Sequence, residues 1–338
     1  VVSPLSIDGD RDNRVLWPSR YDTRDCEVLV PLLASVPPFN AVAVFVTTFL
    51  VVLWEFLTRE YDAVIYFNFL DRTAFPATVG KLFGTPVVVH YADGYLDFHN
   101  RKMAYVERLF LWAGRWTLDG AVCVNNHMAD LVPTANTTVV RGRPSIGMPS
   151  ELPTVDRPDD ETTTVTFIGR FDRNRGIEPF LSVTERVLEQ RDDIVFGVAG
   201  YGPEIGSARR AVERLDRDGA VEFLGTLDRD AYTRRLLKSD LLVNFQRPDG
   251  ELNRHSFPSK LLDFLASGRP AATVDVSDAG MALSDELIVV EDGAELEAVL
   301  ITAASDPDEL EPYGCRAQLW VEQTCTTEAI SRRVLGLW

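Results

Sequence analysis

The chain alternates short apolar runs with longer amphipathic runs along most of its length. In the second half the short runs are rich in β-branched residues and cover 165–171, 194–200, 221–225, 241–245 and 271–276. Between them, apolar residues recur at helical spacing over 176–190, 203–215, 229–238 and 258–267. Continuous apolar strands separated by helices are typical of a parallel sheet that is covered on both faces. The pattern predicts a doubly wound α/β domain.

The first half shows the same alternation. Strands are expected at 1–3, 27–32, 63–68, 86–90, 121–125 and 138–141, and helices at 38–58, 72–83, 98–116 and 127–132. The stretch 148–164 is rich in Pro, Thr and acidic residues, which is typical of an interdomain linker. We therefore expect two Rossmann-like domains, at 1–150 and 151–315, with a cleft between them. A C-terminal helix at 316–338 is expected to pack back toward the first domain.

One uncharged segment stands out within the first half. Residues 28–54 contain no charge, and 41–54 (AVAVFVTTFLVVLW) are strongly apolar. Pro37 and Pro38 interrupt the run and leave about 17 apolar-rich residues, which is the lower limit for a membrane span. Three alternatives stay open for 41–57: a buried core helix, a patch that faces a bilayer, and a span.

Composition narrows the classes of function. The chain has 338 residues, of which 46% are hydrophobic, and its formal net charge of −17 repels nucleic acid. Lysine is scarce among its 34 basic residues, and this acidic, arginine-based composition resembles proteins of salt-loving archaea; the alternative is an ordinary acidic cytosolic protein. No signal peptide is visible, and no Cys-X-X-Cys pair occurs, so a reducing, cytoplasmic setting is expected. The cysteines are Cys26, Cys123, Cys315 and Cys325.

The first loop of the second half, GRFDRNRG (169–176), carries two cations. Arg170 and Arg175 follow a predicted strand, and Gly176 lets the chain turn into a helix. Two guanidinium groups beside a helix N-terminus form a site for a polyanion such as a diphosphate. The alternative is that both are solvated arginines on an acidic surface.

Two further loops follow at the ends of later strands. AGYGP (199–203) places Gly200 and Gly202 after a buried strand, and FPSK (257–260) places Ser259 and Lys260 at a helix start. A cation in the first turn opposes the helix dipole, so Lys260 makes physical sense if phosphate binds there. The alternative is a long side chain that carries its ammonium group into water.

Together these motifs resemble a known family. The motifs occur in a fixed order: GR followed five residues later by RG, then GYGP, VEFLG and FPSKLLDFLASGRP. This order is similar to the nucleotide-sugar half of GT-B glycosyltransferases of group 1 (family 4). Enzymes of that family act in surface polysaccharide and glycan assembly. The resemblance covers about 165–275, and it is weaker over 1–150, where HYADGY fits the acceptor half. It implies two Rossmann-like domains that face a cleft. It also implies transfer of a hexose-type sugar from a nucleoside diphosphate to a hydroxyl of a lipid-linked or polysaccharide acceptor, with retention and without metal or cofactor.

The resemblance also implies roles for individual residues. Arg170, with Arg175 or else Lys260, would neutralise the donor diphosphate, and the backbone N–H groups at Ser259 and Lys260 would cap it. The ribose and base would meet Asp263, Gly200, Gly202 and the stretch around Leu224.

This sequence departs from the family pattern at one place. The family usually has two glutamates eight positions apart, whereas here the second place is Asp263 and the first is His255. This resembles a PSK-type variant that lacks the first glutamate, and Glu251 or His255 could contact the donor sugar instead.

In the first half, His90 and Asp93 lie at the carboxyl end of a predicted strand. Asp93 could act as a general base toward the acceptor hydroxyl, and a helix N-cap is its alternative role. His90 is a second catalytic candidate, and a structural role is its alternative.

Other classes of site are less well supported. Asp-X-Asp triplets, such as those at 10–12 and 228–230, are expected by chance in so acidic a chain, and P-loop, HExxH, GxSxG and GxGxxG motifs are absent. Two other functions stay open: a nucleotide-sugar epimerase that uses His255 and Glu251, or an inactive nucleotide-sugar-binding partner protein. The expected location is the cytoplasm or the cytoplasmic face of a membrane. The sequence does not identify the base, the sugar, the acceptor or the oligomeric state.

Overall fold

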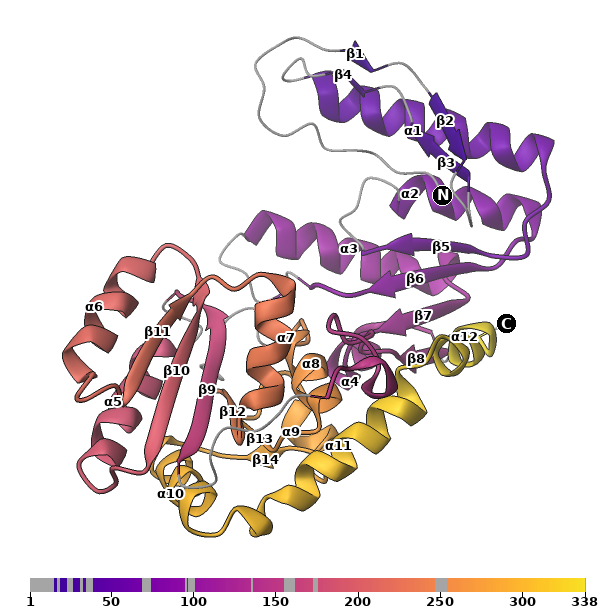
Figure 1. The fold of residues 1–338 in the computed structure, drawn as a ribbon. Helices are drawn as coiled ribbons and strands as arrows, with labels where there is room; N and C mark the ends of the chain where they lie inside the picture. The colour runs from indigo at the N-terminus through magenta and orange to yellow at the C-terminus, as the bar shows by residue number, and fades with distance from the viewer. Residues whose placement is uncertain are drawn as a thin grey trace. The chain divides into compact units, whose positions relative to one another are not determined.

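The computed structural model describes most of the chain, in two compact units (Figure 1). Contacts between Cα atoms group Val1–Val139 and Val334–Trp338 into the first unit and Val140–Arg333 into the second. The described residues are 15–16, 19–22, 27–30, 33–34, 39–68, 74–94, 96, 101–134, 136–154, 162–172, 176–246 and 254–337.

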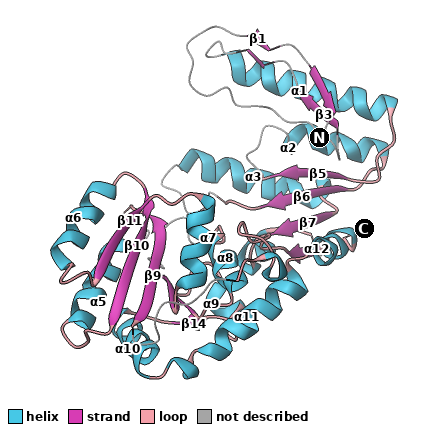
Figure 2. Ribbon diagram, in the orientation of Figure 1, coloured by secondary structure: helices cyan, strands magenta, loops and turns pink. Residues whose placement is uncertain are grey.

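The first unit contains a parallel sheet with the order β5-β6-β7-β8 (Figure 1), and Figure 2 draws its strands in magenta. Its strands are β5 (Val64–Phe67), β6 (Val87–Tyr91), β7 (Gly120–Cys123) and β8 (Thr137–Val139). The helical segments are α1 (Phe39–Thr58), α2 (Ala74–Ala77), the 3-10 helix η1 (Thr78–Phe83), α3 (Arg101–Thr117) and α4 (Asn126–Leu131). The predicted alternation of strand and helix is therefore present from residue 39 onward.

Two antiparallel strand pairs precede this sheet. β1 (Val15–Leu16) pairs with β4 (Leu33–Ala34), and β2 (Ser19–Asp22) pairs with β3 (Glu27–Val30). The prediction that 27–32 joins a parallel sheet is therefore wrong. The connection between β2 and β3 is much shorter than the crossover that parallel neighbours need. The strand expected at 1–3 lies outside the described residues.

The second unit is built on a parallel sheet with the order β11-β10-β9-β12-β13-β14. Its strands are β9 (Thr163–Arg170), β10 (Ile194–Tyr201), β11 (Val221–Gly225), β12 (Leu241–Asn244), β13 (Ala271–Thr273) and β14 (Ile288–Val289). Its helices include α5 (Ile177–Leu188), α6 (Ile205–Leu215), α7 (Arg229–Lys238), α8 (Lys260–Ser267), α9 (Ala279–Ala282) and α10 (Gly293–Ser305). The strand order changes direction between β9 and β12, and ligands of open α/β sheets bind beyond the strand ends at such a switch point.

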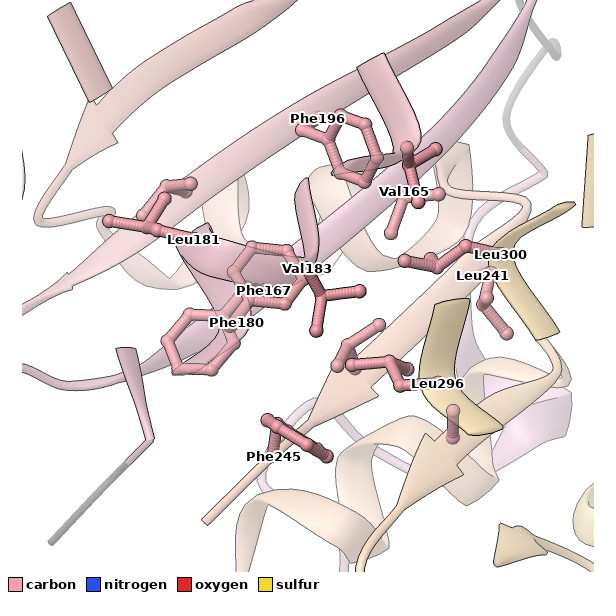
Figure 3. Packing of buried hydrophobic residues seen from close by; sticks show 14 of the residues in the cluster. Val165, Phe167, Phe180, Leu181, Val183, Phe196, Leu241, Phe245, Leu296 and Leu300 are labelled. Atoms are coloured by element: carbon pink, nitrogen blue, oxygen red, sulfur yellow. The ribbon is translucent and has the colours of Figure 1, made fainter. Parts of the chain in front are cut away.

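Apolar side chains cover both faces of this sheet. On one face Phe167 stacks on Phe180 of α5, with 4.8 Å between ring centroids, and Phe196 lies beside them (Figure 3). On the other face, Leu236 of α7 and Phe264 of α8 belong to a second buried cluster. The continuous apolar strands of the sequence are therefore explained by burial on two sides.

The C-terminal region differs from the prediction of one helix at 316–338. It forms α11 (Glu311–Thr324) and α12 (Thr327–Leu335), with a break at Cys325. The hydroxyl of Thr326 accepts a hydrogen bond from the Ala329 N–H (3.1 Å), so Thr326 caps a new helix rather than continuing the old one. In the described part of the chain, no helix combines the length and apolar character needed to cross a membrane.

Candidate functional site

A pocket of about 470 Å³ lies beyond the carboxyl ends of the central strands of the second unit. Arg170 from β9, Tyr201 from β10, Gln246 after β12 and Lys260 from α8 all line it. A larger groove of about 640 Å³ runs between α5 and α6, and no strand residue lines it. Since the smaller pocket lies at the switch point, it is the better candidate for the functional site.

Two glycines allow the backbone segments at these strand ends to approach closely. Gly200 has φ +154°, and a Cβ there would lie 1.9 Å from the carbonyl oxygen of Gly169, its neighbour on β9. Gly176, before α5, has φ +74°, and a Cβ there would lie 1.4 Å from the carbonyl oxygen of Phe245. A side chain would clash at either position, so glycine is needed at both, and Gly200 itself lines the pocket.

Lys260 bridges α8 and β9. Its Nζ donates a hydrogen bond to the carbonyl oxygen of Ile168 (2.8 Å) and lies 5.5 Å from the centroid of the Phe167 ring. The side chain thus returns to the strand end instead of extending into water. Ser259 precedes it without a side-chain cap bond, so no Ser259 hydroxyl occupies the first N–H groups of α8.

Arg170 brings a second cation to the same pocket. Its side chain is half exposed, and its Nε lies 3.1 Å from Oδ2 of Asp172. Five predicted site residues therefore line one cavity, namely Arg170, Gly200, Ser259, Lys260 and Asp263. Arg175 lies outside the described residues.

Asp263 accepts hydrogen bonds on both carboxylate oxygens. Oδ1 accepts from the N–H groups of Ser145 (2.5 Å) and Ile146 (3.2 Å), and Oδ2 accepts from the hydroxyls of Ser145 (2.8 Å) and Tyr232 (2.9 Å). Burial, together with the adjacent Asp263 carboxylate, raises the pKa of Tyr232. Sequence reasoning found neither Ser145 nor Tyr232, because neither belongs to a motif.

The other predicted donor residues lie elsewhere or are not described. Gly202 and Leu224 are outside the lining of the pocket, whereas Thr226 and Leu227, just beyond β11, contribute to it. His255 is buried and is also outside the lining. Glu251 lies outside the described residues.

In the first unit, the loop after β6 is held by Asn68. Its Oδ1 accepts hydrogen bonds from the N–H groups of Ala92 (2.8 Å) and Asp93 (3.1 Å), and Asn68 itself is buried with φ +52°. Asp93 is exposed. His90 packs edge-on against Phe67, with 5.4 Å between centroids, and burial lowers the pKa of His90. Asn68 thus fixes the backbone of the loop that carries Asp93, which the sequence did not reveal.

An acidic triplet of the sequence has a structural role. Asp228 is the N-cap of α7, and its carboxylate accepts a hydrogen bond from the Ala231 N–H (2.8 Å).

Comparisons with known proteins agree with this architecture. Residues 162–311 match the family described as "Glycosyl transferases group 1". A search of curated proteins found no match. Among solved structures, Alr3699/HepE of Anabaena in complex with UDP has a TM-score of 0.69 at 15% identity, over 91% of this chain and 85% of that chain. Sucrose-phosphate synthase of Thermosynechococcus elongatus has a TM-score of 0.68 at 14% identity, over 97% and 85%.

A further similar structure is larger than this chain. TarM has a TM-score of 0.64 at 14% identity, over 95% of this chain but only 63% of its own length. At such low identity these structures show the fold alone. The chain therefore has a GT-B-like fold with two parallel sheets, and its second unit carries the match to the group 1 glycosyl transferases.

Proposed function

We propose that this protein is a glycosyltransferase that moves a sugar from a nucleoside diphosphate to a hydroxyl group. The observation that carries the proposal is the pocket at the strand ends, which Arg170 and Lys260 both line in a chain of net charge −17. That pocket lies in the unit that matches the glycosyl transferases of group 1. The similar structure of HepE has been solved with UDP and with UDP-glucose, so UDP is the first ligand to test.

The proposed chemistry needs stabilisation of a departing diphosphate. The bond between the anomeric carbon and the diphosphate oxygen breaks, and the diphosphate takes the electron pair while the acceptor oxygen bonds the carbon. Arg170, Lys260 and the first N–H groups of α8 would stabilise the growing charge, and positioned cations of this kind replace a metal ion. Asp93 would accept the proton of the acceptor hydroxyl. We propose retention at the anomeric carbon.

We assign the donor to the second unit and the acceptor to the first, which corresponds to the domains expected at 151–315 and 1–150. A lipid-linked or glycan acceptor at the cytoplasmic face of a membrane fits the surface of α1. Exposed apolar side chains recur along one side of this helix, while its polar Thr48 and Glu55 are buried. The exposed ones include Val46, Leu50, Trp54 and Leu57. A peripheral contact of 41–57 with the membrane would cover them.

The alternative functions have weaker support. An epimerase needs acid–base groups beside the sugar ring, and His255 is buried outside the pocket lining. An inactive binding protein would hold the donor without consuming it. Donor turnover separates the three: transfer or hydrolysis supports the transferase, sugar isomerisation supports the epimerase, and binding without turnover supports the inactive protein.

Calorimetry with UDP, GDP, ADP and UMP tests the pocket. We expect a nucleoside diphosphate to bind more tightly than the matching monophosphate. Arg170→Ala and Lys260→Ala should each weaken diphosphate binding by roughly 1–3 kcal/mol, the scale of a charge-assisted hydrogen bond. Arg210→Ala is the matched control, because Arg210 lies in the groove between α5 and α6. Equal affinities in Arg170→Ala, Lys260→Ala and the unaltered protein would remove this pocket as the donor site.

A further inference from the structure

Helix α3 of the first unit presents large apolar side chains to solvent. Tyr105, Leu109, Trp112 and Trp116 are 69%, 50%, 52% and 63% exposed. Their spacing of four, three and four residues places them in one stripe along the helix. The rings of Trp112 and Trp116 contact each other edge-on, with 4.6 Å between centroids. An exposed stripe of this size marks a surface that meets another phase or molecule.

Basic residues flank the stripe. Lys102, Arg108 and Arg115 are exposed on α3, and helical spacing puts Lys102 on one side of the stripe and the two arginines on the other. The single acidic residue of the helix, Glu107, is buried on the opposite side, where its carboxylate accepts a hydrogen bond from the Tyr91 hydroxyl (2.8 Å). The charged side chains that α3 exposes among the described residues are therefore all basic, although the whole chain carries a net charge of −17.

We propose that the outer face of α3 docks onto a lipid bilayer that contains anionic lipids. Tryptophan and tyrosine favour the boundary between headgroups and acyl chains, and arginine and lysine beside them meet anionic headgroups. A second copy of the chain is a poorer occupant, because an antiparallel two-fold contact between two α3 helices would place the arginines of both copies on the same side of the contact. The outward side chains of α1 carry no comparable set of cations, so α3 supplies the lipid selectivity. This docking does not depend on the transfer reaction.

Vesicle sedimentation tests the proposal. The full chain is mixed with vesicles of phosphatidylcholine, or of phosphatidylcholine with phosphatidylglycerol, at low and high salt. We expect binding to the anionic vesicles that weakens as salt rises. Arg108→Gln with Arg115→Gln should lower the partition coefficient on anionic vesicles about tenfold and remove the preference over neutral ones. Trp112→Gln with Trp116→Gln should lower binding about tenfold or more on anionic vesicles.

Matched control variants on other helices show whether a loss of vesicle binding is specific to the outer face of α3. Arg210→Gln with Arg214→Gln removes two exposed arginines from α6, and Leu319→Gln removes an exposed apolar side chain from α11. Both should bind vesicles as the unaltered protein does, and circular dichroism should show all variants folded. Failure of the unaltered protein to bind anionic vesicles, or equal losses in the controls, overturns the proposal. So does a dimer in analytical ultracentrifugation that Trp112→Gln with Trp116→Gln abolishes, because a second copy would then cover the stripe.

Discussion

Replacing Asp263 with alanine should destabilise the second unit strongly. The change leaves the backbone N–H groups of Ser145 and Ile146 without their acceptor, and each unsatisfied buried group costs about 1–3 kcal/mol. The hydroxyls of Ser145 and Tyr232 lose the same partner but can rotate toward other acceptors. We therefore expect Asp263→Ala to lower the free energy of unfolding by roughly 3–5 kcal/mol.

The amide of asparagine provides the matched comparison. Asp263→Asn keeps Oδ1 for the two N–H groups, and its NH₂ group can donate to the Ser145 and Tyr232 hydroxyls. The cost should fall to about 1–2 kcal/mol, and Tyr232→Phe should cost about 1 kcal/mol. Urea unfolding followed by circular dichroism measures all three. The reasoning is refuted if Asp263→Ala unfolds within 1 kcal/mol of the unaltered protein, or if Asp263→Asn is as damaging as Asp263→Ala.

Binding of two ligands then shows whether Asp263 only stabilises the fold or also contacts the donor. If Asp263 also meets the ribose, Asp263→Asn should weaken UDP binding and leave inorganic diphosphate binding unchanged. Equal losses for both ligands would instead indicate a general disturbance of the pocket.

Three further predictions concern charged groups. Asp172→Asn should release Arg170 from its ion pair and raise the affinity for UDP by up to about fivefold, which is the scale of an exposed ion pair. Calorimetry measures this affinity, and an unchanged or lower value contradicts the prediction. Asp278→Ala should lower the free energy of unfolding by about 3–5 kcal/mol, because it leaves the largely buried side chain of Arg141 without the carboxylate that lies 2.7 Å away. Urea unfolding shows whether the loss is this large. Burial lowers the pKa of His90 below 6.5, so the unfolded chain binds the proton more readily and stability should fall as pH drops below that value. Melting temperatures between about pH 5 and about pH 8 should therefore depend less on pH in His90→Gln, and an identical pH dependence would show that His90 does not contribute.

The sequence was most informative where local pattern and tertiary burial agree. The strand at 221–225 was predicted with the bounds that β11 has, because each end is marked by residues that stop a strand. β14, at Ile288–Val289, was missed because so short a strand has no measurable period. The single C-terminal helix was predicted because its apolar spacing continues through Cys325, and the new cap at Thr326 was not anticipated.

At the candidate site, the sequence predicted the loops but not the contacts between residues that are far apart in the chain. The loops with Arg170 and Lys260 were found because strand-to-helix loops of a parallel sheet gather at one edge. The partners of Asp263 were not found, because Ser145 lies 118 positions away in the chain and no local pattern links the two. The hydrogen bond from Lys260 to the carbonyl oxygen of Ile168 was not predicted for the same reason.

The contrast between an acidic molecule and a cationic pocket affects how fast ligands arrive. An anion approaching from afar meets the field of a net charge of −17, whereas Arg170 and Lys260 act only over the last few ångströms. Dissolved ions screen the distant field much more than the contacts inside the pocket. Adding salt should therefore speed the capture of a nucleoside diphosphate, the reverse of what is usual for an enzyme that attracts its substrate through opposite charge.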